Sequence, residues 1–264
     1  MLKKRIIFTL LYNDGYFVQS RNFNLQNVGN ADWLNKNYNF QQISKFIDEL
    51  IIIDISRKKK NTKNFLKDVI KISNNCFIPL TIGGGITNLE IAKKYFSCGA
   101  DKILLNGDDK NNLIINEIAS VYGNQALILT LDYKIIDEKY VIFKNHGSIR
   151  VNKSFKNYLN EVLDYPSGEI IFNSIDRDGV GTGLDLNVVE KLPIRNKKSV
   201  ILSGGCGNVI HFKSALKNPK VDAVSTANLL NFVGDGLKNA REDLIKNKFN
   251  IANWQDLHVN NKLL

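Results

Sequence analysis

Acidic residues at the ends of apolar segments are the first candidates for chemistry in this sequence. Asp132 directly follows the apolar run 127–131. Three further aspartates lie at or just after similar runs, and they are Asp54, Asp176 and Asp178. A carboxylate at the end of a buried strand can line a cleft and act as a general acid or base. The set therefore predicts proton transfer in a cleft.

Glycine-rich turns follow two of the apolar runs, as Gly84-Gly85 and Gly204-Gly205. Because glycine has no Cβ, backbone N–H groups there can approach an anion closely, and a following helix N-terminus adds partial positive charge. Two more pairs complete two candidate phosphate cradles: Asn106 with Gly107, and Ala227 with Asn228. A ligand with an anionic group at each end would fit cradles that face each other. The alternative, that these glycines only form tight turns, stays open.

Four charged residues of alternating sign open apolar runs, and they are Arg5, Glu49, Lys102 and Glu169. If the strands close into a barrel and these side chains point inward, they form a ring of paired charges at the barrel floor. Such a ring could open to pass a small neutral molecule. Four unrelated surface charges are the alternative interpretation.

The elements that must position these residues are short. Eight apolar runs have strand length: 5–11, 50–55, 78–82, 102–106, 126–132, 169–174, 199–203 and 222–227. They are nearly continuous in apolar character, as in parallel strands covered on both faces. Stretches of helical period separate most of them: 65–73, 89–97, 113–121, 155–163, 186–191, 209–216 and 237–246. The order predicts an α/β fold, a (βα)₈ TIM barrel, with the active site at the carboxyl ends of the strands. An open doubly wound sheet is less favoured, because no Gly-x-Gly-x-x-Gly motif follows the first run.

The two halves of the chain resemble each other. Gly83-Gly84 superposes on Gly204-Gly205 and Asp101 on Asp222 at an offset of 121 positions, and Glu49 superposes on Glu169 at an offset of 120. We therefore expect one domain, residues 1–264, built from half-barrels of about 1–121 and 122–245 with a tail at 246–264. In this superposition Leu11 occupies the position of Asp132, so the first half lacks the matching acid.

Composition excludes several classes of protein. With 264 residues and 44% hydrophobic residues, a disordered or fibrous chain is not expected. The net charge of +10 is spread over the chain, apart from one basic run, Arg57-Lys58-Lys59-Lys60 with Lys63. Neither nucleic-acid nor membrane binding is therefore expected. The basic run would lie on the active-site face, where it could attract an anionic substrate or form a solvated loop.

Cofactor and localisation signals are missing. The three cysteines are widely spaced and the histidines are scattered, so no disulfide framework, metal site or cofactor is expected. The apolar stretch at the N-terminus is too short for a signal peptide, and no run approaches the ~20 apolar residues of a membrane span. We expect a cytoplasmic protein.

Longer motifs carry a resemblance to a known family. They are Asp48-Glu49-Leu50, residues 82–86, Gly99-Ala100-Asp101-Lys102 and residues 174–179. From residue 4 to about 232 the chain resembles the HisF family, the cyclase subunit of imidazole glycerol phosphate synthase. The resemblance implies a duplicated barrel that receives ammonia from a HisH-like glutaminase, its partner in a heterodimer.

The resemblance also assigns roles to residues. It implies an ammonia gate formed by the four charged residues at the strand starts, with Asp101 beside it at the glutaminase interface. It implies that Asp132 is catalytic, and that substrate or phosphate is bound at these positions: Gly84, Gly85, Asn106, Gly107, Asp178, Gly179, Gly204, Gly205, Ala227 and Asn228.

The sequence departs from the family at a critical place. The family closes the imidazole ring with two aspartates, and Leu11 replaces the first. Phe8-Thr9 stand where the family usually has Pro-Cys, and Asn228 where it has Ser. Loss of a general acid or base typically costs about 10²- to 10⁴-fold in rate. Leu10-Leu11 with Asp14-Gly15, together with residues 172–176, resembles a paralogous branch in bacterial surface-sugar pathways, which make lipopolysaccharide O-antigen or flagellin glycans.

Three hypotheses follow. In the first, the chain channels ammonia to a separate amidotransferase that converts an acetamido to an acetamidino group on a sugar; its substrate is a small phosphorylated compound or a nucleotide-sugar. In the second, it is a histidine-pathway cyclase, which turns the ribulosyl aminoimidazole carboxamide ribotide and ammonia into imidazole glycerol phosphate with a substitute acid: Asp14, Asp54 or Asp178. In the third, it is a non-catalytic scaffold that activates the glutaminase.

Overall fold

Parallel strands form a closed barrel. The computed structural model describes residues 3–38, 40–57, 60–74, 76–107, 112–227 and 235–252. Eight of the strands in these ranges pair side by side in parallel: β1 (Arg5–Asn13), β4 (Glu49–Asp54), β5 (Leu80–Gly83), β6 (Lys102–Asn106), β7 (Leu127–Ile136), β10 (Glu169–Ser174), β11 (Ser199–Ser203) and β12 (Ala223–Thr226). β12 pairs with β1 and β7 pairs with β10, so no strand is left at an edge. The prediction of a (βα)₈ barrel is confirmed.

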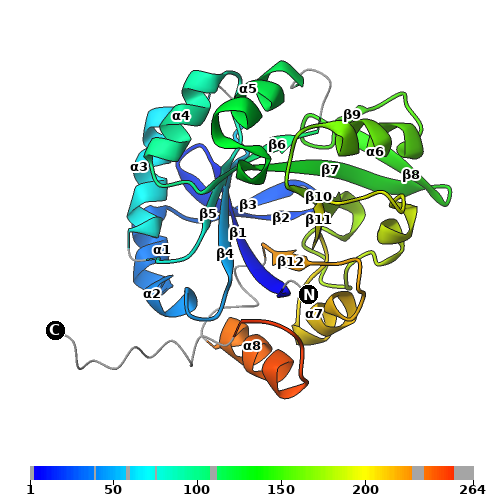
Figure 1. Cartoon of the computed structure of the whole chain (residues 1–264). Helices are drawn as coiled ribbons and strands as arrows, with labels where there is room; N and C mark the ends of the chain where they lie inside the picture. Colours follow the sequence, from blue (N-terminus) through cyan, green and yellow to red (C-terminus); the bar gives the residue numbers. More distant parts are fainter. Residues whose placement is uncertain are drawn as a thin grey trace.

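Helices cover the outside of the barrel, and Figure 1 shows α3, α4 and α5 around β4, β5 and β6. Their bounds are α1 (Ala31–Asn37), α2 (Phe40–Ile43), α3 (Thr62–Ser73), α4 (Leu89–Ser97), α5 (Asn112–Tyr122), α6 (Phe155–Asp164), α7 (Val209–Leu216) and α8 (Gly236–Lys246). Asn61, Asn88 and Asn208 begin α3, α4 and α7, since each side-chain oxygen accepts a hydrogen bond from a backbone N–H of the first turn. The predicted helix 186–191 is instead a short 3₁₀-helix, η4 (Asn187–Lys191), which Pro193 follows.

Two antiparallel extensions leave the barrel, one made of the hairpins β1–β2 and β2–β3 and the other of β7–β8 and β8–β9, and neither was predicted. β1 continues past the barrel and turns back into β2 (Tyr16–Arg21) and β3 (Asn24–Gly29), while β7 turns back into β8 (Lys139–Lys144) and β9 (Ile149–Arg150). The turns lie at Asp14-Gly15 and Asp137-Glu138, all four with positive φ, as tight two-residue hairpin turns require. Each half of the predicted repeat thus carries a hairpin after its first strand. Asp132 accordingly lies inside a long strand and does not end it.

The apolar core has two parts, because each barrel strand is buried on both faces. The larger part lies between the strands and the helices. The smaller part fills the inside of the barrel with Ile7, Ile51, Leu104, Ile128, Ile171, Ile201 and Ala223. No helix in the described ranges has both the length and the apolar character that a membrane span requires.

A buried ion pair attaches α8 to the barrel floor. The Arg241 guanidinium donates to both carboxylate oxygens of Asp48, at 3.1 and 2.5 Å. One of those oxygens also accepts the backbone N–H of Ile6, at 2.8 Å. The Arg241 side chain is only 3% exposed, so neither charge can be solvated by water if its partner is removed.

We therefore expect Asp48→Ala to lower the free energy of unfolding by about 3 kcal/mol, because it leaves the Arg241 charge buried without its carboxylate. Urea denaturation measures the change. Glu242→Ala, at an exposed position of the same helix, is the control and should stay within about 0.5 kcal/mol. Equal effects of the two substitutions would contradict a structural role for the ion pair.

Candidate functional site

A cavity of about 350 Å³ opens at the carboxyl ends of the barrel strands. One wall is polar and comes from the second half of the chain, with Thr130, Asp132, Asn173 and Asp178. The first half lines the cavity with the apolar side chains of Leu11, Leu25, Ile53 and Ile55, and with polar residues that include Asp54. The active site of a barrel of this type is expected at this end.

Asp132 projects from β7 into the cavity. Its carboxylate accepts a hydrogen bond of 2.9 Å from the Asn173 side chain on the neighbouring strand β10. Burial raises the pKa of Asp132 to about 6; the hydrogen bond from Asn173 opposes this rise, and the negative charge of Asp178 adds to it. A carboxyl group with such a pKa exchanges its proton near neutral pH, as a general acid or base must.

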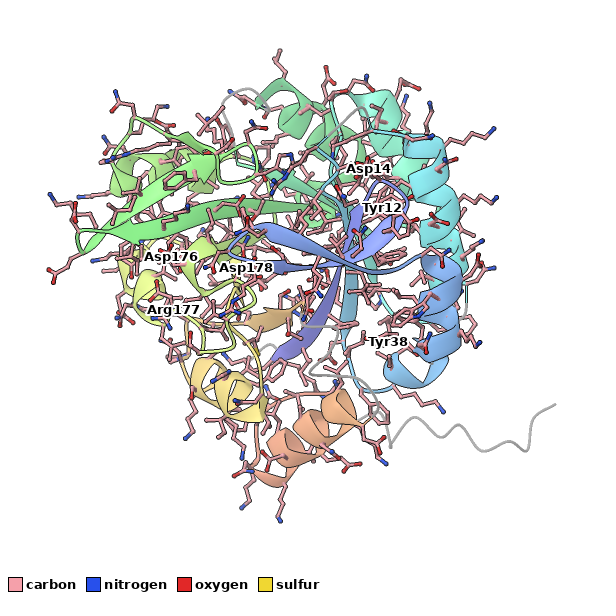
Figure 2. The ribbon with its side chains drawn as sticks, turned by 180° about the vertical axis from the view of Figure 1, so that it is seen from behind. Tyr12, Asp14, Tyr38, Asp176, Arg177 and Asp178 are labelled. Carbon is pink, nitrogen blue, oxygen red and sulfur yellow. The ribbon has the colours of Figure 1, made fainter. Side chains whose placement is uncertain are left out.

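Asp178 lies near Asp132 and is held by the β2–β3 hairpin. Its carboxylate accepts hydrogen bonds from the Ser20 hydroxyl at 2.5 Å and from the Phe23 backbone N–H at 3.1 Å. Burial raises its pKa, and these hydrogen bonds oppose the rise. Figure 2 shows the hairpin reaching from the side of Tyr12 and Asp14 across the barrel mouth to Asp178. The hairpin therefore couples the first half of the chain to the polar wall.

The other candidate acids divide into two groups. Asp54 lines the cavity, where its carboxylate accepts the Ser56 backbone N–H at 2.9 Å. Asp176 does not line the cavity, and the prediction for it is wrong: within the 3₁₀-helix η3 (Ile175–Arg177) its carboxylate accepts the Ile135 backbone N–H at 2.7 Å, outside the barrel. Asp14 is exposed at its hairpin turn and is also outside the cavity lining. Asp54 and Asp178 are thus the candidate substitute acids that share the cavity with Asp132.

The first glycine turn borders the main cavity. Gly84 and Gly85 both have positive φ, and a Cβ on Gly84 would lie 2.0 Å from the backbone oxygen of Asp54. Only glycine fits there. Asn106 lines the same cavity, but Gly107 does not: it packs on Val162 of α6, 2.8 Å from the place of its missing Cβ, contrary to the expectation that it belongs to the cradle.

The second glycine turn borders an adjoining recess of about 30 Å³. Five expected residues line it, and they are Asp178, Gly179, Gly204, Gly205 and Ala227. Asp178, Ser203 and Ser225 line both the recess and the main cavity, so the two spaces adjoin. Asn228 lies outside the described residues. No group of three or more histidine, cysteine, aspartate or glutamate side chains suited to a metal ion occurs in the described part of the chain.

The four charges at the strand starts meet in one ring at the opposite end of the barrel. Arg5 pairs with Glu49 at 3.1 Å and with Glu169 at 2.5 Å. Lys102 pairs with the same two carboxylates at 2.9 and 2.6 Å. Burial favours the neutral acid, but hydrogen bonds and charges from Arg5 and Lys102 outweigh it and lower the pKa of Glu169. The four ion pairs thus close the ring on itself.

Two hydroxyl groups complete the ring, and the sequence did not reveal either of them. Thr81 on β5 donates to Glu49 at 2.6 Å, and Ser199 on β11 accepts from Arg5 at 3.0 Å. Their signal in the sequence is weak, because each is a small polar residue beside an apolar run. They satisfy hydrogen bonds that the ion pairs leave open.

A single apolar layer separates the ring from the cavity. Ile51, Leu104 and Ile171 lie two residues after Glu49, Lys102 and Glu169 on the same strands, so their side chains point to the same face, into the barrel. All three also line the cavity floor. The distance from ring to cavity is therefore one layer of side chains.

Asp101 lies beside Lys102 at the floor. Its carboxylate accepts the Leu80 backbone N–H at 2.8 Å, and the residue is exposed. Asp222, its equivalent in the predicted repeat, accepts the Val200 backbone N–H at 2.8 Å. Both aspartates thus hold the start of the preceding strand, and Asp101 remains accessible at the surface of the floor.

Known proteins resemble this chain in sequence over nearly its whole length. The family model of the histidine biosynthesis protein matches residues 5–234. A provisionally named imidazole glycerol phosphate synthase subunit hisF2 of Parasynechococcus marenigrum is 44% identical over 256 residues, covering 96% of this chain and 95% of the relative. The HisF subunits of imidazole glycerol phosphate synthase from Pelodictyon phaeoclathratiforme and Chlorobium limicola are 35% and 34% identical, over 92% of this chain and 96% of each relative.

The chain therefore belongs to the histidine biosynthesis protein family, a class that the closed parallel barrel fits. Within that family it is a HisF-type protein, as the resemblance of its motifs implied.

The raised pKa of Asp132 predicts a pH-dependent effect on stability. The folded pKa of about 6 is above that of an unfolded aspartate, so the ionised carboxylate destabilises the fold above pH 6, and the cost vanishes as pH falls below about 4. Asp132→Asn should raise the free energy of unfolding by about 3 kcal/mol at pH 7.5 and leave it nearly unchanged at pH 4.

Urea denaturation at the two pH values measures this difference. Glu117→Gln, which removes an exposed carboxylate from α5, serves as the control and should have little effect at either pH. A gain of the same size at pH 4 and pH 7.5 would show that Asp132 titrates normally.

Proposed function

We propose that the chain is the HisF-type subunit of a glutamine-dependent complex and receives ammonia through the charge ring. The observation that carries the proposal is the position of the ring, one apolar layer below a cavity that holds Asp132. Names of similar proteins support the same assignment, since they are subunits of imidazole glycerol phosphate synthase.

The arrangement suits a neutral molecule. The layer above the ring consists of isoleucine and leucine side chains, which an ammonium ion would cross only at a high cost of desolvation. Uncharged ammonia avoids that cost. An opening in the ring would require one of the ion pairs made by Arg5 or Lys102 to separate. Ammonia could therefore pass only after the side chains of the ring move apart.

The partner is a HisH-like glutaminase, bound as a heterodimer at the floor of the barrel. Glutamine hydrolysis would then release ammonia next to the ring. Exposed Asp101, which neighbours Lys102, fits a contact residue at this interface. The proposed reaction needs no metal or cofactor in this chain.

Two uses of the ammonia are compatible with the cavity. In imidazole glycerol phosphate synthesis, Asp132 would serve as one acid–base group, and Asp54 or Asp178 would replace the second. Leu11 favours the other use, because it lines the cavity at the position where the resemblance of the sequence implies the family's first catalytic aspartate. In that case ammonia passes to a separate amidotransferase, which converts an acetamido to an acetamidino group on a surface-polysaccharide or flagellin sugar.

Two experiments separate these uses. Growth of a cyclase-deficient strain at the normal rate on this gene would establish the cyclase and show that it needs no aspartate at position 11. Reconstitution with the glutaminase and the sugar amidotransferase tests the other use: amidination that runs equally well without this chain would reject it.

Lys102→Gln tests the ring. We expect product formed per glutamine hydrolysed to fall several-fold, because the two ring carboxylates lose a shared cation and the ring no longer closes. Lys156→Gln, at an exposed position of α6, is the control. If Lys102→Gln still binds the glutaminase and leaves the ratio unchanged, the chain acts as a scaffold that activates the glutaminase without conducting ammonia.

Leu11→Asp tests the missing acid. The substitution restores a carboxylate to the cavity lining of the first half and should raise the rate of imidazole ring closure by about 10²-fold or more if only this acid is lacking. Leu25→Asp places the same group elsewhere on that lining and should give no gain. Equal rates for the original chain and Leu11→Asp would mean that another residue already supplies the function.

A further inference from the structure

A groove of about 790 Å³ lies on the outside of the barrel, between β8, α6 and the end of η4. Figure 1 shows β8 and β9 beside α6, on one side of the molecule. The groove has no lining residue in common with the cavity, and its lining contains neither Asp101 nor a member of the ring. The proposed route of ammonia therefore does not involve this groove.

One side of the groove is the outer edge of β8. Asp137 and Glu138 form a two-residue hairpin turn, and the residues that flank such a turn make a hydrogen-bonded pair. Lys139 and Val141 therefore direct their backbone N–H and C=O groups toward β7. Tyr140 lies between them, and its two backbone groups point the opposite way, toward the groove.

β9 covers only the other end of this edge. The Val151 backbone N–H donates to the Ile142 oxygen at 2.9 Å, and the chain then bends at Asn152 and Lys153 to enter α6. Continued pairing would have placed Lys153 opposite Tyr140. In the described part of the chain, no strand pairs with Tyr140 on this side. An open edge of this kind is a template for pairing with another chain.

The groove carries an excess of positive charge. Glu138 is the one acid among its lining residues, and Lys153 pairs at 2.8 Å with Glu161, which lies outside the lining. The basic side chains of the lining outnumber these two acids, and they are Lys139, Arg150, Lys153, Lys156 and Lys191. Lysines beside an open edge disfavour pairing with an apolar strand, whereas an acidic strand complements them.

The aromatic rings of the lining favour a peptide over a nucleic acid as the occupant. The ring centroids of Tyr140 and Phe155 lie 4.9 Å apart, and both rings also contact Tyr133. The Lys191 ammonium group lies 5.7 Å from the centroid of the Tyr140 ring. These contacts leave little ring surface on which a base could stack. A phosphate cannot donate to the Tyr140 C=O group, whereas a peptide backbone supplies both a donor and an acceptor.

We propose that this groove, which we call the β8 groove, binds an acidic segment of a partner protein as an added strand beside Tyr140. Backbone hydrogen bonds to Tyr140 align the segment, and its carboxylates face the cations of the groove. Because one residue offers few hydrogen bonds, the charges contribute much of the affinity, and binding weakens as the salt concentration rises. The proposal goes beyond the ammonia route, since it concerns a surface outside the ring and the cavity.

Fluorescence polarisation of the full chain with a labelled octapeptide of alternating glutamate and threonine tests the proposal. Arg150→Gln/Lys191→Gln removes one exposed cation from β9 and one from η4. Lys63→Gln/Lys67→Gln removes two exposed cations from α3 and is the matched control for net charge. We expect the groove variant to raise the Kd of the peptide about fivefold or more, and the control to change it less than about twofold.

Hydrogen exchange gives a second measurement. The peptide should slow exchange of the Tyr140 amide and leave the amides of β3 unchanged, although β3 also pairs on one side only in the described ranges. The proposal is overturned if the peptide does not bind, if the groove and control variants bind it equally, or if exchange at Tyr140 stays the same. A thymidine oligonucleotide of equal charge that binds the groove as tightly as the peptide would also overturn it, because the groove would then recognise charge without a strand.

Discussion

The ring of four charges, two buried carboxylates paired with two half-buried cations, is the interaction on which the arrangement of this barrel depends. Taking four charged groups away from water is costly, and the cost is met only if every charge has partners in good geometry. Arg5 and Lys102 each contact both Glu49 and Glu169. Removal of any one of the four therefore leaves two charged partners that still bear the cost of desolvation but have lost an ion pair. Hydroxyl groups on two further strands add hydrogen bonds.

The same ring constrains strand register. Glu49 lies beside Ile7 on β1, and Lys102 beside Thr81 on β5, so the strands are staggered as they go round the barrel. A slip of one residue would turn a charged side chain out of the ring and an apolar one into it. Correct register then places the apolar layer above the ring and Asp132 above that layer. The strand register therefore determines both the ring at the barrel floor and the position of Asp132 in the cavity.

Above the ring, the two halves of the chain differ in chemistry. The second half supplies carboxylates held by amide and hydroxyl groups, whereas the first half supplies Leu11 and its apolar neighbours. The hairpins compensate for this difference in part, because β2–β3 crosses the mouth and holds Asp178 through Ser20 and Phe23. The contrast between an intact ring and an altered cavity is what raises the question of where the ammonia is used.

The sequence predicted the barrel because its strands are continuous apolar runs. Strands β6, β10 and β11 match their predicted bounds, as do helices α4 and α7. The hairpins do not follow from the apolar runs, because their strands are half-exposed extensions. Asp176 could not be separated from Asp178 by position alone, since the direction of each side chain depends on a 3₁₀ turn and on the β7 extension.

An isotope experiment tests the central claim, that the ring is the entrance for ammonia, most directly. The complex with the glutaminase is supplied with glutamine labelled with ¹⁵N in the amide group, in the presence of excess unlabelled ammonium, and the nitrogen transferred to the product is analysed by mass spectrometry. Passage through the barrel predicts that the transferred nitrogen is almost entirely ¹⁵N. Transfer of the two isotopes in proportion to their concentrations in solution would contradict it.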